Sequence, residues 1–199
     1  MTSFWLRRLH RLKAFFGEVP DNLDDFILAS QITQAEAMKF FVELFRQQKG
    51  VKQGILWWNI RDGWPIVSDA VVDYYNNKKL AFHYLKAVQR DVQAICCEEA
   101  QGQHGVVVVN DTRRAVRGHI EVTRVGDGAK LIDTAFEVQP NGKANVGTLP
   151  HPAKTEMWRL KWIPEGMSAY TSHYLATSTE VSFAQYKEWL QVPDLLPFS

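Results

Sequence analysis

The chain has 199 residues, of which 46% are hydrophobic, and its 23 basic and 22 acidic side chains leave a formal net charge of +1. With so little net charge, neither nucleic acid nor an anionic membrane is expected as a partner. No apolar run approaches the ~20 residues of a membrane helix, and the basic start lacks the roughly 7 to 15 apolar residues of a secretory signal. A cytoplasmic location is the default expectation, although a signal would be lost with any missing N-terminal part.

The first part of the chain is patterned as helix, strand and helix. Asn22 can cap a helix that stops at residues 49–50, a Lys-Gly pair. Residues 54–58 then form a short apolar run without alternation, which is typical of a strand buried on both faces of a parallel sheet. Asn76 or Asn77 can cap a second helix. This order of elements is typical of a barrel or an open α/β sheet.

Aromatic and polar side chains follow the apolar run. Asn59, Arg61 and Asp62 come directly after Trp58, and Trp64 closes the stretch. The carboxyl ends of strands carry the ligand sites of barrels and open α/β sheets. Aromatic rings at such a site stack on the apolar faces of sugars, while polar side chains bind the hydroxyls. The stretch predicts a sugar-binding rim; the alternative is that its tryptophans are large core or lid side chains.

Beyond Arg90 the pattern changes to short β runs separated by turns. Residues 106–109 are a β-branched run, and apolar residues alternate with polar ones over 120–124 and 158–162. Turn residues lie at 126–128, 140–142 and 164–166. This spacing predicts a β-sandwich. Ser182 can cap a final helix that needs an apolar surface to lie on.

The sequence offers few other groups for chemistry. Cys96 and Cys97 are adjacent, so on a strand they face opposite ways and are expected to stay reduced. Four histidines lack the short spacings of a metal site and are expected to be satisfied or exposed: His83, His104, His119 and His173. No nucleophile elbow and no phosphate-cradling glycine loop is present. Neither a metal nor a cofactor is expected.

Several ordered segments carry a family resemblance. Residues 54–65 (GILWWNIRDGWP), 67–75 (VSDAVVDYY) and 78–84 (KKLAFHY) resemble the C-terminal part of family 2 glycoside hydrolases, particularly the β-mannosidase-like branch. Shorter segments match in the same order: 28–36 (LASQITQAE), 109–112 (VNDT), 160–162 (LKW), 173–175 (HYL) and 186–189 (YKEW). The resemblance implies an α/β plus all-β chain. Residues 1–90 would be the C-terminal end of a (β/α)8 barrel, its last strand and flanking helices, and residues 91–199 an immunoglobulin-like β-sandwich with a short C-terminal helix.

The resemblance also implies where the site lies. Retaining glycosidases need two carboxyls about 5 to 5.5 Å apart, and in this family both precede the matched segments, so no catalytic residue is expected here. The family pattern places the sugar-stacking aromatic at Trp58, and the expected substrate contacts are Trp58, Asn59, Asp62 and Trp64. Arg61 stands where β-mannosidases usually have Asn, which bears on sugar specificity. Ser68, Asp69 and Asp73 are expected to hydrogen-bond the loop before the last helix.

Two functions remain open. In the first, the chain is the C-terminal part of a retaining glycosidase acting on β-linked sugars, a β-mannosidase or else a β-galactosidase or β-glucuronidase, and is inactive alone. In the second, it is a non-catalytic carbohydrate-binding or protein-interaction module. Because a lone barrel strand exposes unpaired edges and an apolar face, residues 1–90 are expected to be poorly ordered, self-associated, or completed by the remainder of the barrel in the same or another chain.

Overall fold

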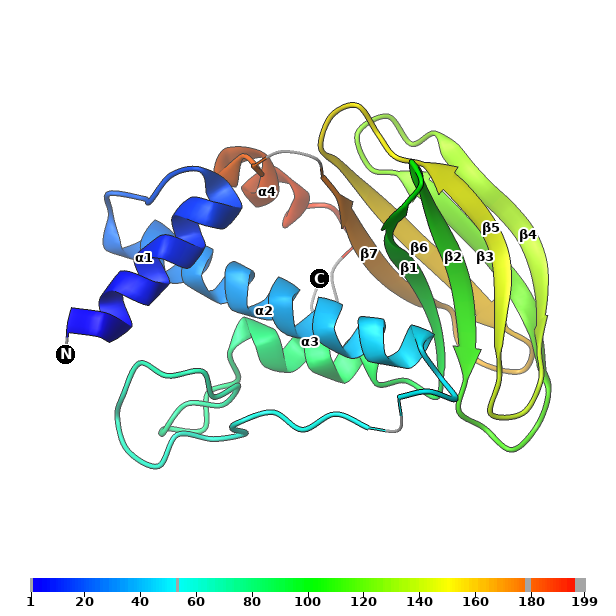
Figure 1. Cartoon of the computed structure of the whole chain (residues 1–199), viewed down its shortest axis with the longest axis horizontal. Coiled ribbons are helices and arrows are strands. Elements are labelled where there is room, and N and C mark those ends of the chain that lie inside the picture. Colours follow the sequence, from blue (N-terminus) through cyan, green and yellow to red (C-terminus); the bar gives the residue numbers. More distant parts are fainter. Residues whose placement is uncertain (1, 53, 178–179, 196–199) are drawn as a thin grey trace.

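Helices gather at one side of the molecule and strands at the other (Figure 1). The computed structural model describes residues 2–52, 54–177 and 180–195, with side chains described from Leu9 onward within those ranges. The helices are α1 (Thr2–Phe16), α2 (Leu23–Gln47), α3 (Leu80–Val88) and α4 (Phe183–Trp189). The strands are β1 (Val92–Ala100), β2 (Gln103–Asn110), β3 (Val116–Arg124), β4 (Lys130–Val138), β5 (Lys143–Pro150), β6 (Glu156–Pro164) and β7 (Tyr170–Ala176). No helix within the described ranges is long and apolar enough to span a membrane.

Two of the three predicted side-chain caps, at Asn22 and Ser182, are confirmed. The Asn22 side chain accepts a hydrogen bond from the amide of Asp25 at 2.9 Å, at the start of α2. The Ser182 hydroxyl accepts one from the amide of Gln185 at 3.3 Å, at the start of α4. Each cap satisfies a backbone donor that the first helical turn leaves without an intrahelical partner.

The strand expected at residues 54–58 is not formed. The segment is extended but carries no strand assignment, and the described residues supply no neighbouring strand to pair with it. Its side chains alternate all the same: Ile55 and Trp57 pack against the helical core, while Leu56 and Trp58 are 97% and 88% exposed. A ladder needs a partner backbone, so the apolar pattern alone could not make a strand here.

The cap expected for α3 at Asn76 or Asn77 is also wrong. The helix begins at Leu80, and its N-cap residue Lys79 makes no side-chain cap. Asn77 instead belongs to a turn, where its amide donates to Asp73 Oδ1 at 2.7 Å and its side chain donates to Asp73 Oδ2 at 2.9 Å. The carboxylate of Asp73 therefore holds Asn77 in a loop that ends before the helix begins.

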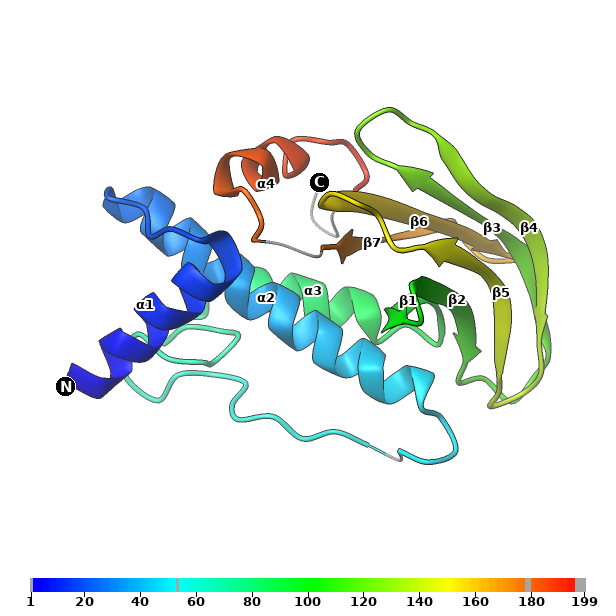
Figure 2. The same ribbon diagram turned by 45° about the horizontal axis from the view of Figure 1, so that its top comes forward.

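The predicted β-sandwich is confirmed, and Figure 2 shows its two sheets facing each other. One sheet has the strand order β1-β2-β5 and the other β4-β3-β6-β7, with antiparallel pairing throughout. The fourth strand joins the sheet of β3, unlike the immunoglobulin constant arrangement, in which it pairs beside the fifth. The alternating residues of β6 point into the core, and the indole of Trp162 donates to the Val92 carbonyl of the opposite sheet at 3.1 Å.

Both cysteines are free thiols on β1, as predicted. Cys96 is buried in the sandwich core and Cys97 is half-buried. Burial raises the pKa of both thiols, that of Cys96 well above its usual value. A thiol with a raised pKa carries little thiolate near neutral pH, so neither cysteine is an activated nucleophile.

Helix α4 returns to the helical side and completes its core. Phe183, Tyr186 and Trp189 are buried against α1 and α2, which provide the apolar surface that this helix was expected to need. The ring of Phe183 meets Phe16 edge to face, with centroids 5.2 Å apart. Helix α4 is the element that follows β7 in the chain, so its packing on α1 and α2 joins the helical part to the sandwich.

Candidate functional site

Trp58 lines a cleft of about 1090 Å³. The cleft runs along α2, with α1 at one end and the ends of β1, β2 and β7 at the other. Its volume is slightly above the range of small-molecule sites, which span ~300 to 1,000 Å³. Of the four predicted contacts, Trp58 lines this cleft, whereas Asn59, Asp62 and Trp64 do not.

Asp62 is buried inside its loop, with 4% of its surface exposed. One carboxylate oxygen accepts from the ammonium of Lys79 at 3.1 Å, and the other accepts from the hydroxyl of Ser68. Ser68 in turn accepts from the amide of Ala70 at 2.9 Å. The expectation that Ser68 and Asp73 hold the loop is confirmed, and Asp62 joins that network.

The rest of the predicted rim is open to solvent. Trp64 is 64% exposed, and Asn59 is half-buried. Arg61 is exposed and donates to the Tyr74 carbonyl at 3.1 Å, which ties the rim to the loop before α3. Asp69, the third residue expected to support this loop, accepts through its carbonyl from Gln34 at 2.7 Å. These contacts fix the backbone of the loop and leave the rings of Trp58 and Trp64 accessible.

A buried polar network closes the inner wall of the cleft, and it was missed by sequence reasoning. Glu36 Oε1 lies 2.7 Å from His173 Nε2 of β7 and also accepts from the hydroxyl of Tyr186. The hydroxyls of Tyr186 and Tyr84 are 2.9 Å apart. One carboxylate of α2 therefore links α3, α4 and the sandwich. The only sequence signal is the polar set Glu36, Lys39 and Glu43 on one face of a largely apolar helix.

The charges of this network are set by competition between burial and pairing. Burial opposes ionisation of Glu36, but the charge and hydrogen bond of His173, together with Lys39 and Tyr186, outweigh it and lower the pKa of Glu36 to about 2. Burial raises the pKa of Glu43, and the ammonium of Lys39 at 2.7 Å offsets only part of that effect. Among the described residues, no group of histidine, cysteine and acidic side chains is arranged to hold a metal ion.

The lowered pKa of Glu36 predicts loss of stability in acid. The folded pKa of about 2 lies below the ordinary value of 4.5, so the stabilisation is complete above about pH 4.5 and is lost as the pH falls toward 2. A shift of this size corresponds to about 3 kcal/mol. Urea unfolding at a series of pH values should show this decline, and Glu36→Gln should flatten it. An equally steep decline in Glu36→Gln would assign the acid sensitivity to other groups.

Comparisons with known proteins add a family context. No protein-family model matches the chain. Beta-mannosidase B of Aspergillus oryzae is 26% identical over 158 residues, which cover 68% of this chain and 19% of that protein. Beta-mannosidase B of Aspergillus terreus is 37% identical over a shorter stretch of 70 residues, or 34% of this chain. The chain thus spans about a fifth of the length of the curated relative from Aspergillus oryzae.

Solved structures agree on the fold. The β-D-mannosidase of Dictyoglomus thermophilum superposes with a TM-score of 0.74 at 24% identity, covering 88% of this chain and 22% of that one. An exo-chitosanase of Amycolatopsis orientalis gives a TM-score of 0.66 at 18% identity over 85% of this chain and 21% of that one. The resemblance seen in the sequence is confirmed: the chain is similar to β-mannosidases over part of their length, which is consistent with the C-terminal part of a β-mannosidase-like protein of glycoside hydrolase family 2.

Proposed function

We propose that this chain forms the C-terminal part of a retaining glycoside hydrolase that acts on β-linked sugars. β-Mannosides are the first candidates, with β-galactosides and β-glucuronides next. The chain would supply the rim of the sugar site, and the two catalytic carboxyls would come from polypeptide outside it. The observation that carries the proposal is the ring of Trp58, which is 88% exposed where it borders the cleft of about 1090 Å³.

Residues 1–90 fit the end of a (β/α)8 barrel. The extended segment 54–58 lies between α2 and α3 in the sequence and packs one side of its chain on the helical core. Its other side exposes Leu56 and Trp58, and no backbone hydrogen bond joins residues 54–58 to another described segment. A strand on each side would satisfy these groups. The rest of the barrel, in the same or another chain, is the proposed source of both strands.

The proposed roles of the rim residues follow from their exposure. Trp58 and Trp64 present open rings that can stack on the apolar face of a sugar. Asn59 provides an amide for hydroxyl groups. Asp62 is enclosed by Lys79 and Ser68, so we assign it to holding the loop from which Trp64 projects. Its contribution to sugar binding would therefore be indirect.

The purified chain is expected to leave 4-nitrophenyl β-D-mannoside and β-D-galactoside unhydrolysed, because it holds neither catalytic carboxyl. The measurement is nitrophenol release at high protein concentration, with Trp58→Ala as the background control. Hydrolysis that co-purifies with the chain and disappears in Trp58→Ala would contradict the assignment of catalysis to absent residues.

The same samples test the second function, a non-catalytic carbohydrate-binding module. The cleft is lined by residues of this chain, so a sugar could bind there without being cleaved. A saturable titration with mannose or mannobiose that is lost in Trp58→Ala, but retained in Ile163→Ala, would favour this function. Ile163 is a matched control because it is an exposed apolar residue on the sandwich, outside the cleft.

A further inference from the structure

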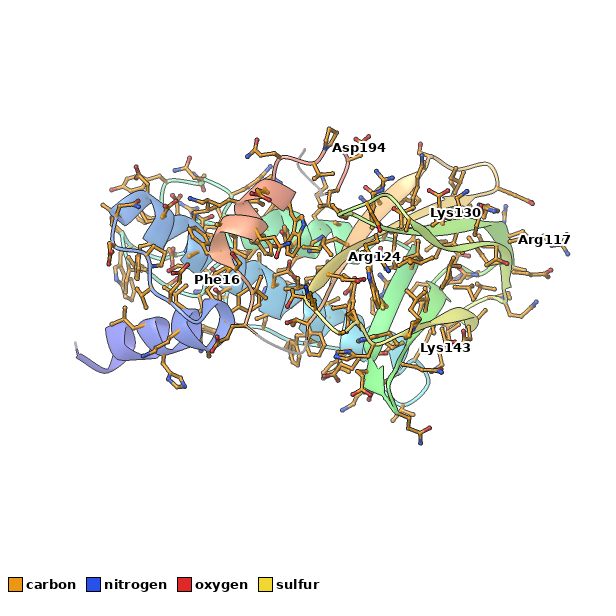
Figure 3. All side chains as sticks on the ribbon, turned by 90° about the horizontal axis from the view of Figure 1, so that it is seen from above. Phe16, Arg117, Arg124, Lys130, Lys143 and Asp194 are labelled. Atoms are coloured by element: carbon orange, nitrogen blue, oxygen red, sulfur yellow. The ribbon has the colours of Figure 1, made fainter. Side chains whose placement is uncertain are left out.

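A second, smaller pocket lies where the end of α2 meets the sandwich. This junction pocket has a volume of about 450 Å³, within the ~300 to 1,000 Å³ of small-molecule sites. Its charged lining consists of four cations and one carboxylate: Arg46, Lys49, Lys52, Lys143 and Asp111. Figure 3 labels Lys143 on the sandwich side of this junction. The pocket therefore carries three more positive than negative charges.

Part of this positive charge has structural partners. Arg46 donates to the Val88 and Arg90 carbonyls and lies 2.8 Å from Asp111, which also pairs with Lys49. Lys143 donates to the Gln47 carbonyl at 2.7 Å. Cations are favourable beside the carbonyls at helix ends. Burial lowers the pKa of Arg46, and the charge and hydrogen bond of Asp111 only partly oppose this effect.

The remaining positive charge has no anionic partner among the described residues. No described carboxylate pairs with Lys52 or Lys143, and the Lys52 ammonium lies 4.9 Å from the centre of the Phe45 ring. An ammonium group has three donors, and Lys143 uses one of them on Gln47. The junction pocket thus combines unused donors with an apolar wall that includes Val42, Phe45 and Ile55.

We propose that the junction pocket binds a small oxyanion group, phosphate or sulfate, either as the free ion or as the ester of a sugar. Charge-assisted hydrogen bonds from lysine and arginine to such groups are short and strong. The apolar wall and the volume leave room for the sugar ring of an ester. The site does not depend on the proposed function. The junction pocket is lined by Gly54 and Ile55, at the start of the extended segment, whereas Trp58 lies at the end of that segment.

Calorimetry and thermal unfolding of the full chain test this site. Inorganic phosphate, sulfate and glucose 6-phosphate are the probes, and glucose is the neutral control. Saturable binding with a rise in Tm is expected for the anions, weakening as sodium chloride is added. The double variant Lys52→Ala/Lys143→Ala should weaken binding at least tenfold. Lys161→Ala, an exposed lysine on β6 away from the pocket, should leave it unchanged.

A charge change of the opposite sign separates binding from a merely structural role. Asp111→Asn removes the competing carboxylate, so anion affinity should rise severalfold even if the variant is less stable without ligand. If glucose 6-phosphate binds more tightly than phosphate, the preferred ligand is the sugar ester. If the two bind equally, the preferred ligand is the free ion. The proposal is overturned if no anion binds saturably, if the double variant binds as well as the parent, or if Asp111→Asn binds more weakly.

Discussion

Replacing Glu36 with alanine is expected to lower the free energy of unfolding by about 3 to 5 kcal/mol. The carboxylate is buried and accepts from His173 at 2.7 Å and from the hydroxyl of Tyr186. Its removal leaves the buried imidazole of His173 and the hydroxyl of Tyr186 without their charged partner. Because this network joins α2 to α4 and β7, the loss should weaken the whole helical side.

Urea unfolding measures the effect directly. Glu18→Ala is the matched control, because Glu18 is an exposed carboxylate just before α2 and should change stability by less than about 0.5 kcal/mol. His173→Ala and the double variant complete a cycle, in which the combined loss should be clearly smaller than the sum of the single losses. Additive losses, or a Glu36→Ala variant as stable as Glu18→Ala, would show that the pair contributes little.

The sandwich was predictable because its signals are local. Alternating apolar residues in β3 and β6 and the turns at 126–128, 140–142 and 164–166 place the strands close to where they are found. Side-chain caps at Asn22 and Ser182 act within three residues, so they too can be read from the sequence. Strand β4 pairs with its chain neighbour β3 rather than with its other chain neighbour β5, and the strand patterns alone do not decide between these two partners.

The errors fall where the outcome depends on distant groups. The apolar run at residues 54–58 was expected to be a strand, and its side chains do alternate in exposure, but a strand needs partners that the described chain lacks. Asparagine is a favourable N-cap residue, but the amide of Asn77 donates to the carboxylate of Asp73 in a turn that precedes the helix. A side chain such as Asn77 can either cap a helix or take part in a turn, and the conformation of the surrounding loop decides between the two.

The candidate site was predictable only in part. The apolar run that ends in aromatic residues, together with the family resemblance, points to Trp58, which borders the cleft; its contact with a sugar stays a prediction. The network of Glu36 and His173 joins residues 137 positions apart, and the junction pocket joins the end of α2 to turns of the sandwich. No spacing rule connects such groups before the tertiary fold is known.

Fusing this chain to a truncated relative should give an enzyme that hydrolyses β-mannosides, whereas we expect each part alone to be inactive. The β-D-mannosidase of Dictyoglomus thermophilum provides the host, since 88% of this chain superposes on 22% of that protein. A host truncated before that region should be inactive, because the part that superposes on this chain is missing. The truncated host fused to this chain should regain activity, because we expect its barrel strands to pair with both sides of the extended segment 54–58.

Within the fusion, Trp58→Ala should lower kcat/KM about 30-fold. Burying an aromatic face against the sugar is worth about 2 kcal/mol, and each ~1.4 kcal/mol is a factor of ten in rate. Trp58→Phe should recover part of the loss because a ring remains. Ile163→Ala, remote from the cleft, should leave the kinetics unchanged.

Hydrolysis of 4-nitrophenyl β-D-mannoside by the fusion, with and without Trp58→Ala, is the most direct test of the claim that this chain forms the rim of a glycosidase site. The account predicts an active fusion, an inactive truncated host and a large loss in Trp58→Ala at unchanged Tm. A folded fusion whose activity is the same with alanine at position 58 would contradict it.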